Sequence, residues 1–169
     1  MKRIDKENYY LDIAETVLER STCLRRCYGA IIVKNDEIIS TGYNGAPRGR
    51  KNCVDLNYCT REKMNIPSGE RYELCRSVHA EANCIISAAR KDTLGATLYM
   101  ACRNPKTDEL IPHSTSCSMC RRLIINAGIR RVVIRDTPEE YRIVDVEEWV
   151  EQDDSLPVLS GEEVCGKCE

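Results

Sequence analysis

Three side chains in two short motifs have the types and spacing of a catalytic zinc site. His79 is followed two residues later by Glu81, and Cys117 is followed three residues later by Cys120. One His and two Cys supply three ligands, which leaves the fourth position of a tetrahedral zinc for water. Glu81 could move protons to and from that water, since a carboxylate beside a metal often acts as a general acid and base. The two motifs therefore predict a hydrolytic zinc centre.

The composition indicates a single globular domain. The chain has 169 residues, of which 42% are hydrophobic and 31% are charged, as is typical of a soluble protein with one sizeable core. The sequence shows no apolar run of about 18 residues, and its first residues lack an apolar segment. We therefore expect no transmembrane helix, no secretory signal and no membrane partner, and we predict a cytoplasmic location.

The net charge of −2 hides an uneven distribution along the chain. Residues 1–135 carry 23 Lys and Arg against 15 Asp and Glu, whereas residues 136–169 carry 2 against 12. A basic body suits an anionic substrate such as a nucleotide, and an acidic end argues against unspecific binding of nucleic acid. An unevenly charged, solvated surface would give the same counts, so the charge alone leaves both interpretations open.

The elements expected around the motifs alternate between strands and helices. An amphipathic helix is predicted over residues 8–20, and an antiparallel hairpin follows around the turn residues Lys34-Asn35-Asp36. A glycine-rich loop at 42–49 and a long irregular insertion at 50–77 come next. The remaining expected helices cover 80–90, 117–127 and 147–151, and the remaining strands cover 96–100, 131–134 and 142–146. This order predicts a mixed sheet with helices on both faces, and it places both metal motifs at helix starts.

Eleven Cys in a chain without a visible signal peptide favour metal binding and reduced thiols over disulfides. Four of them lie in or near the irregular insertion: Cys23, Cys53, Cys59 and Cys75. A second, structural zinc held by these thiols would explain how a polar loop keeps one shape, with Cys27 as an alternative fourth ligand. Unlinked thiols would give the same spacings, so both interpretations remain open. The terminal pair Cys165 and Cys168 resembles half of a metal-binding knuckle and leaves the same choice open.

Taken together, these motifs resemble the zinc-dependent cytidine and deoxycytidylate deaminase superfamily, whose signature combines His-x-Glu with a later Cys-x-x-Cys. The matching motifs are Val78-His79-Ala80-Glu81-Ala82-Asn83 and Cys117-Ser118-Met119-Cys120. Two further matching pieces are Thr41-Gly42-Tyr43-Asn44-Gly45-Ala46-Pro47-Arg48-Gly49 and Ala127-Gly128-Ile129. The resemblance covers most of residues 8–135 and is closer to the deoxycytidylate branch than to the free-nucleoside or tRNA branches.

The resemblance implies a cytidine deaminase-like fold, which is an α/β three-layer α/β/α sandwich around a mixed sheet of about five strands. It implies that His79, Cys117 and Cys120 bind the catalytic zinc. Glu81 would move a proton from the attacking water to the ring nitrogen and the leaving amine, as ammonia leaves carbon 4 of a cytosine ring. Asn44 matches the Asn of the family's loop after the second strand and would hydrogen-bond the sugar or the base.

The sequence departs from the family pattern at two places. Ser116 stands where the family usually has Pro before the first Cys, and the loop 103–115 is longer than in compact members, which leaves base and phosphate specificity open. Planar guanidinium groups suit phosphate oxygens. The candidates for this role are Arg25, Arg26, Arg48 and Arg50. The sequence does not choose among them, and we name Arg26 and Arg48 as candidate substrate-binding residues.

The resemblance predicts an enzyme, a zinc hydrolase that converts dCMP to dUMP and ammonia in pyrimidine deoxynucleotide metabolism. One alternative is a deaminase of another nucleoside, nucleotide or tRNA base. Another is a non-catalytic zinc-binding module for assembly or regulation, against which the presence of Glu81 counts. The deaminase domain is expected over 1–152, with an acidic tail at 153–169. The family further implies a homo-oligomer, often a hexamer, and dCTP and dTTP as effectors, whereas the acidic tail argues against a nucleic-acid partner.

Overall fold

A hairpin forms one end of the sheet. In the computed structural model, which describes residues 3–153, β1 (Cys27–Lys34) pairs antiparallel with β2 (Glu37–Tyr43). The turn residues Asn35 and Asp36 both have positive φ, at 51° and 63°. Positive φ at both central residues is typical of a type I′ turn, whose twist matches that of the flanking strands, and Asn and Asp tolerate it. The hairpin predicted around these residues is confirmed.

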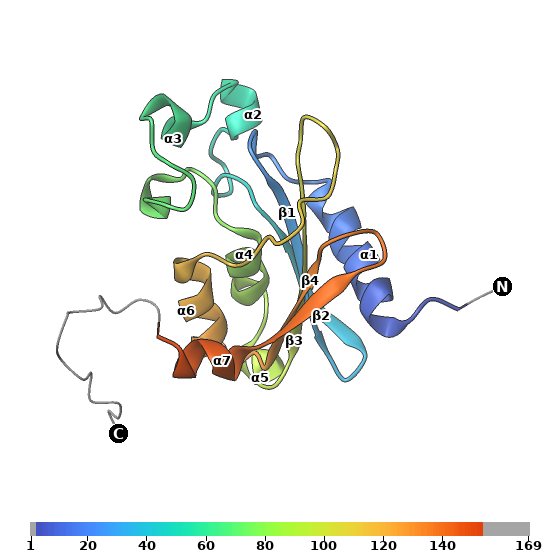
Figure 1. Cartoon of the computed structure of the whole chain (residues 1–169). Helices are drawn as coiled ribbons and strands as arrows, with labels where there is room; N and C mark the ends of the chain where they lie inside the picture. Colours follow the sequence, from blue (N-terminus) through green and yellow to red (C-terminus); the bar gives the residue numbers. More distant parts are fainter. Residues whose placement is uncertain (1–2, 154–169) are drawn as a thin grey trace.

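Three further strands complete a five-stranded mixed sheet in the order β2-β1-β3-β4-β5 (Figure 1). They are β3 (Thr97–Arg103), β4 (Arg131–Arg135) and β5 (Tyr141–Asp145). In this sheet of the described residues β3 and β4 run parallel, and the other neighbouring strands pair antiparallel. The parallel pair needs a crossover, which the chain makes through one helix. The prediction of a mixed sheet with about five strands is confirmed.

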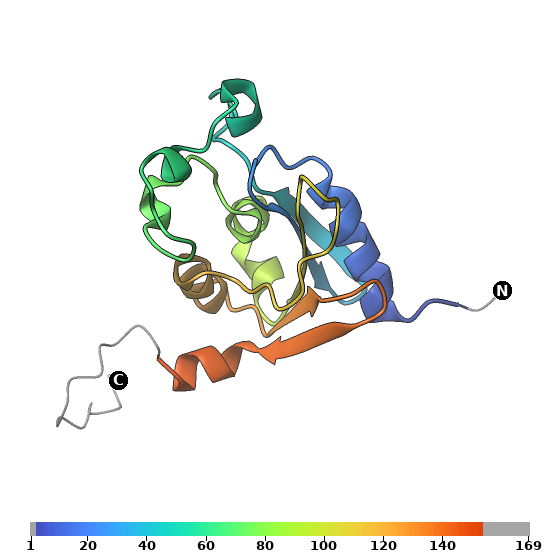
Figure 2. The same ribbon diagram turned by 45° about the horizontal axis from the view of Figure 1, so that its top comes forward.

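The helices form two layers, one on each face of the sheet (Figures 1 and 2). The first, α1 (Lys6–Leu18), packs on β1 and β3. On the other side lie α4 (Ala80–Ile86) and the crossover helix α6 (Ser118–Asn126), with α7 (Val146–Glu151) packed against α6. No helix within residues 3–153 is long and apolar enough to cross a membrane. The three layers are those that the resemblance implied.

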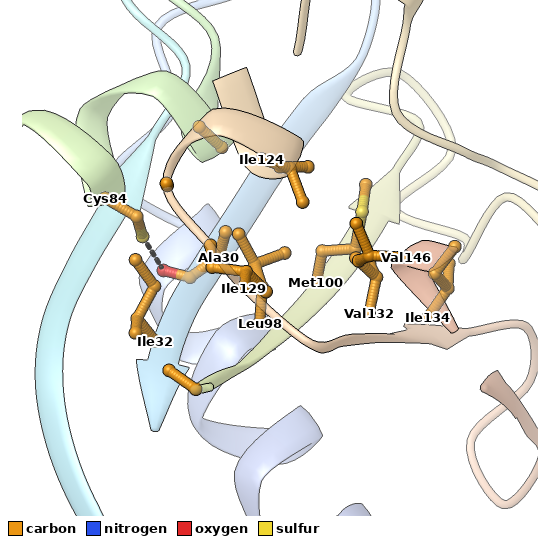
Figure 3. Packing of buried hydrophobic residues seen from close by; sticks show 13 residues of the cluster. Ala30, Ile32, Cys84, Leu98, Met100, Ile124, Ile129, Val132, Ile134 and Val146 are labelled. Carbon is orange, nitrogen blue, oxygen red and sulfur yellow. Dashed lines mark hydrogen bonds between the residues drawn. The ribbon is translucent and has the colours of Figure 1, made fainter. Parts of the chain in front are cut away.

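Side chains alternate between the two faces of the central strands, so each face has its own core. The face toward α4 and α6 is covered by the apolar side chains of Ala30, Ile32, Leu98, Met100, Val132 and Ile134 (Figure 3). The face toward α1 carries Ile31, Val33, Tyr99 and Val133. Cys84 of α4 is fully buried and donates its S–H to the carbonyl oxygen of Ala30 at 3.0 Å (Figure 3). This contact, with the apolar packing around it, joins α4 to the sheet directly after His79.

The helix predicted over 80–90 is wrong in its length. The chain leaves the helix after Ile86 and forms a separate turn, α5 (Arg90–Thr93). Ala89 is extended there, and Thr93, which is buried, donates its hydroxyl to the carbonyl oxygen of Ala127 at 2.7 Å. A straight helix would carry Thr93 away from this acceptor. The break therefore follows from a contact between segments that are distant in sequence, which no local pattern indicates.

The insertion forms three short helical turns with loops between them. These are α2 (Cys53–Leu56), α3 (Thr60–Lys63) and the 3₁₀ turn η1 (Tyr72–Leu74). The chain leaves the body of the protein at Gly45 and returns at Val78, where the two residues form a pair of backbone hydrogen bonds of 3.2 and 2.8 Å. The domain boundary at 152 remains a prediction. The predicted acidic tail, including Cys165 and Cys168, lies outside the described residues from residue 154 on.

Candidate metal centre and active site

Two neighbouring helices begin at the predicted ligands. His79 is the residue before α4 and Cys117 is the residue before α6, and both have an extended backbone. Cys120 follows in the first turn of α6 and is buried. Because α4 and α6 pack together on the same face of the sheet, their starts bring the three side chains together. The sequence motifs predicted this arrangement at helix starts.

The three side chains have the separations that one zinc ion requires. Nδ1 of His79 lies 3.4 Å from Sγ of Cys117 and 3.4 Å from Sγ of Cys120. With bonds of about 2.0–2.1 Å to nitrogen and about 2.3 Å to sulfur at tetrahedral angles, two such ligands of one zinc lie about 3.5 Å apart. Within residues 3–153, this is the one group of three or more such side chains whose donor atoms all lie within 4.8 Å of one another. The donor set and its spacing therefore fit zinc.

The electrostatics of the site favour a thiolate. A hydrogen bond from Cys120 lowers the pKa of Cys117, against the effect of burial and with help from His79. A thiolate is the form of Cys that binds metals. The site thus offers a charged soft ligand beside an imidazole, which matches the preference of zinc over magnesium or calcium.

Glu81 occupies the first turn of α4 and is only 4% exposed. Burial raises the pKa of its carboxyl group, although its own backbone N–H, His79 and Ser116 act in the opposite direction. A carboxyl group whose pKa is raised toward neutrality can accept a proton and give it back. Glu81 lines the same cavity as His79 and Cys117, so a proton carrier and the metal-binding group share one space.

Asn44 lines this cavity, but most hydrogen-bonding groups of its side chain already bond to other residues of the protein. Its Oδ1 accepts hydrogen bonds from the hydroxyl of Ser21 at 2.6 Å and the backbone N–H of Tyr28 at 2.8 Å. Its Nδ2 donates to the carbonyl oxygen of Arg26 at 2.8 Å. An amide has two N–H groups, so one donor is left for a ligand. Asn44 therefore holds the 21–28 segment in place and can offer one hydrogen bond to substrate.

The cavity is closed on one side by the insertion. Arg26, the segment around it and parts of the insertion line the cavity together with the starts of α4 and α6. Arg48, the other predicted substrate-binding arginine, is exposed in the turn after β2 and does not belong to the lining among the described residues. The structure thus brings Arg26 to the cavity and leaves Arg48 outside it, so we build the account of phosphate binding on the lining arginines.

Two residues that line the cavity were not predicted from the sequence. The ring of Tyr72 stands edge-on to the imidazole of His79, with ring centroids 5.2 Å apart and an interplanar angle of 88°. The guanidinium carbon of Arg61 lies 4.4 Å from the centroid of the Tyr72 ring. Both residues lie in the irregular insertion, where no periodicity or motif indicates which side chains turn inward. The Gly45–Val78 bridge was the missing information, because it folds the insertion back over the metal centre.

The four thiols considered for a second metal all line this cavity. Burial raises the pKa of Cys53, and the thiols of Cys23, Cys59 and Cys75 raise it further, which places all three in the neighbourhood of Cys53. Their sulfur atoms do not all lie within 4.8 Å of one another in the part of the chain that the structure describes. The second metal therefore stays a prediction.

Comparison with known proteins agrees with the geometry. Residues 4–136 match the family model described as the cytidine and deoxycytidylate deaminase zinc-binding region. The chain belongs to this family. A deoxycytidylate deaminase of Mycobacterium phage D29 is 38% identical over 138 residues, which cover 79% of this chain and 96% of the phage protein. The deoxycytidylate deaminase of Schizosaccharomyces pombe is 30% identical over 127 residues, covering 75% of this chain but 36% of the yeast protein.

Solved structures show the same fold. The dCMP deaminase of cyanophage S-TIM5, in complex with dCMP and dUMP, is 25% identical and aligns with a TM-score of 0.53 over 80% of this chain and 85% of that chain. The cytidine deaminase of Burkholderia pseudomallei aligns with a TM-score of 0.55 at 17% identity, over 85% and 95% of the two chains. The resemblance inferred from the motifs, and the α/β fold that it implied, are confirmed.

Proposed function

We propose that the protein is a zinc-dependent hydrolase that converts dCMP to dUMP and ammonia. The observation that carries the proposal is that the buried carboxyl group of Glu81 lines one cavity with His79 and Cys117, which form a metal-binding group together with Cys120. Deoxycytidylate deaminases among the relatives support this substrate. The proton carrier is present, which disfavours the non-catalytic alternative.

The chain's own residues have separate tasks in this reaction. Zinc held by His79, Cys117 and Cys120 would lower the pKa of water so that hydroxide is available at neutral pH. Glu81 accepts the proton of the attacking water and delivers it to the ring nitrogen beside carbon 4. A second proton passes through Glu81 to the amine, which leaves as ammonia while the carbon–oxygen double bond of uracil forms. The free N–H of Asn44 can orient the nucleotide during these steps.

The charges of the cavity favour a nucleotide over a nucleoside. Arg25, Arg26, Arg61 and Arg76 line it, against the single carboxyl group of Glu81. Guanidinium groups bind phosphate through parallel N–H donors and keep their charge at all relevant pH values. An anionic substrate would offset the repulsion among these four cations, which supports a phosphorylated form of cytidine or deoxycytidine.

The resemblance extends the proposal to several further properties. We expect a homo-oligomer, a hexamer in the family's usual form, with dCTP and dTTP as effectors, a cytoplasmic location and no nucleic-acid partner. The structural zinc at Cys23, Cys53, Cys59 and Cys75 belongs to the same group of predictions. The location of the four thiols in one cavity supports it.

Ammonia release by the purified protein tests the proposal, with dCMP, dCTP, deoxycytidine, cytidine and an adenosine-bearing tRNA stem as substrates. We expect turnover of dCMP far above the other four. Preference for the tRNA stem or a free nucleoside would replace the proposed substrate, and no turnover of any of them by zinc-loaded protein would favour the non-catalytic alternative. Elemental analysis of the same sample gives two zinc ions per chain if the second site exists and one if it does not.

A further inference from the structure

The cavity at the metal centre contains side-chain donors that are buried and lack a hydrogen-bond partner within residues 3–153. They are Nη1 of Arg25, Nε of Arg61 and Oγ of Ser77. Two of them belong to guanidinium groups, which are charged. A buried charged donor without an acceptor is costly, and such atoms in native proteins have an explanation in a ligand, an ion or ordered water. Three of them in one cavity indicate a ligand with several oxygen acceptors.

Arg61 is the most firmly held of these side chains. The residue is 5% exposed, and its Nη2 donates to the carbonyl oxygens of Pro67 at 2.8 Å and Glu70 at 2.5 Å. One face of the guanidinium lies on the ring of Tyr72. These contacts fix the plane of the group while leaving Nε without an acceptor in the described part of the chain. A fixed, partly unpaired guanidinium is preorganised to bind an anion.

The position of Arg61 suits the far end of a nucleotide. A single aromatic ring, that of Tyr72, separates its guanidinium from the imidazole of His79. The base of the substrate must reach the metal-binding group, and the sugar then carries the 5′-phosphate away from it. The phosphate can therefore reach Arg61 while the base lies at Glu81.

The other arginines that line the cavity differ in whether they keep a buried donor without an acceptor among the described residues. Arg26 hydrogen-bonds Tyr28, which raises the pKa of Arg26, and Arg76 donates Nε to the carbonyl oxygen of Lys51 at 2.6 Å. Arg25 pairs through Nε with Glu62 at 3.2 Å, which leaves its buried Nη1 available. Arg25 and Arg61 are thus the two lining arginines with buried donors that no described residue satisfies.

We infer that Arg61, together with Arg25, binds the 5′-phosphate and thereby makes the site select nucleotides over nucleosides. Ser77 supplies a third donor from the end of the insertion. The inference rests on the proposed deamination of a nucleotide and names the residues that read its phosphate. The insertion therefore has a function beyond lining the cavity, because its Arg61 determines which substrates bind.

Arg61→Met and Arg25→Met in the full, zinc-loaded chain test the inference. The matched control is Arg48→Met, which removes the same charge from an exposed position outside the cavity. Two measurements are needed: kcat and KM for dCMP and for deoxycytidine, and the calorimetric Kd for dUMP and for deoxyuridine. Arg61→Met also removes the hydrogen bonds to Pro67 and Glu70, so a thermal melt of each variant accompanies the kinetics. Arg25→Met leaves those loop contacts intact and decides the question if Arg61→Met does not fold.

Each variant should raise KM for dCMP and Kd for dUMP by about tenfold to a hundredfold, the loss expected for a hydrogen bond to a charged group. The values for deoxycytidine and deoxyuridine, and those of Arg48→Met, should stay within about twofold of wild type. Equal losses on nucleotide and nucleoside would show a structural role and overturn the inference, as would an unchanged nucleotide preference. If the wild-type chain deaminates neither substrate, the proposed function fails. The dUMP and deoxyuridine affinities of wild type and Arg61→Met then still decide whether a phosphate site exists.

Discussion

Asn44 has a structural role and a substrate-binding role, and one substitution tests both through two measurements, the melting temperature and the KM for dCMP. Asn44→Asp keeps the size of the side chain and both acceptor contacts of Oδ1, to Ser21 and Tyr28. It replaces the Nδ2 donor by an oxygen, 2.8 Å from the carbonyl oxygen of Arg26. The side chain is 5% exposed, so water cannot replace the lost hydrogen bond. We expect the 21–28 segment, which carries Arg25 and Arg26, to loosen.

The magnitude follows from these contacts. A buried carbonyl that loses its donor costs about 1–3 kcal/mol of unfolding free energy. For a chain of this size, 1 kcal/mol lowers Tm by about 2–4 °C, so Tm should fall by about 2–12 °C. Burial and the facing carbonyl raise the pKa of the introduced carboxyl group in the folded protein above its unfolded value of about 3.9. The variant therefore loses further stability as the pH rises from the unfolded pKa to the folded pKa of this group. Below it the protonated group can again donate to Arg26.

The assay is a thermal melt of zinc-loaded protein at two pH values, together with dCMP kinetics. Asn57→Asp is the matched control, because Asn57 is exposed and its left-handed backbone, with φ of 54°, also accepts Asp. Its Tm should change by less than the equivalent of about 0.5 kcal/mol. If Asn44→Asp melts like the control while KM for dCMP rises, the side chain acts on the substrate alone and our structural account of it is wrong.

Three further substitutions test other parts of the structure. Glu81→Gln should keep zinc content and Tm but lower kcat/KM for dCMP by about 10²–10⁴, the usual contribution of a general acid and base; nearly wild-type turnover would remove Glu81 from the mechanism. Gly42→Ala places a Cβ against the backbone oxygen of Ala80 at the start of α4. We expect the free energy of unfolding to fall by about 1–3 kcal/mol and zinc to be retained less well, and an unchanged thermal melt would contradict this packing. Arg135→Met removes a fully buried cation that lies 2.8 Å from Glu15. Because Glu15 is partly exposed and stays paired with Arg103, we expect a loss of about 1–3 kcal/mol in the free energy of urea unfolding without a change in kcat; a loss below about 0.5 kcal/mol would show that this pair does not stabilise the fold.

The parts of the fold that the sequence predicted are those governed by local chemistry. Asn35 and Asp36 accept the positive φ that a tight hairpin needs, so the pattern of two β-rich runs around them was sufficient. The metal-binding motifs were also readable, because His79 and Cys117 each stand directly before a helix that other signals predicted. Ligand type, spacing and helix position pointed to the same centre in this case.

Local sequence patterns do not predict which residues bind the substrate. The resemblance assigns Asn44 to the substrate, whereas its partners Ser21 and Tyr28 belong to a segment that no sequence pattern places beside Asn44. Arg48 looked equivalent to Arg26 as a phosphate ligand until the fold placed one in solvent and the other on the cavity. Whether an arginine lines the cavity depends on tertiary contacts between segments that are distant in sequence. The local sequence around an exposed arginine and around a cavity-lining arginine looks the same.

The Gly45–Val78 bridge separates the chemistry of this site from its specificity. Because the chain leaves and returns at adjacent points, the conformation of residues 46–77 can change while the backbone of His79 keeps its position at the start of α4, although Tyr72 of the insertion contacts the imidazole. The entropic cost of closing a loop rises only slowly with loop length, so a long insertion at this point lowers the stability of the fold only slightly. The reacting groups therefore sit on helix starts packed against the core, while Arg61 approaches the same cavity from the least regular segment. A change in the insertion should accordingly alter which substrate enters before it alters whether the metal-binding group can form.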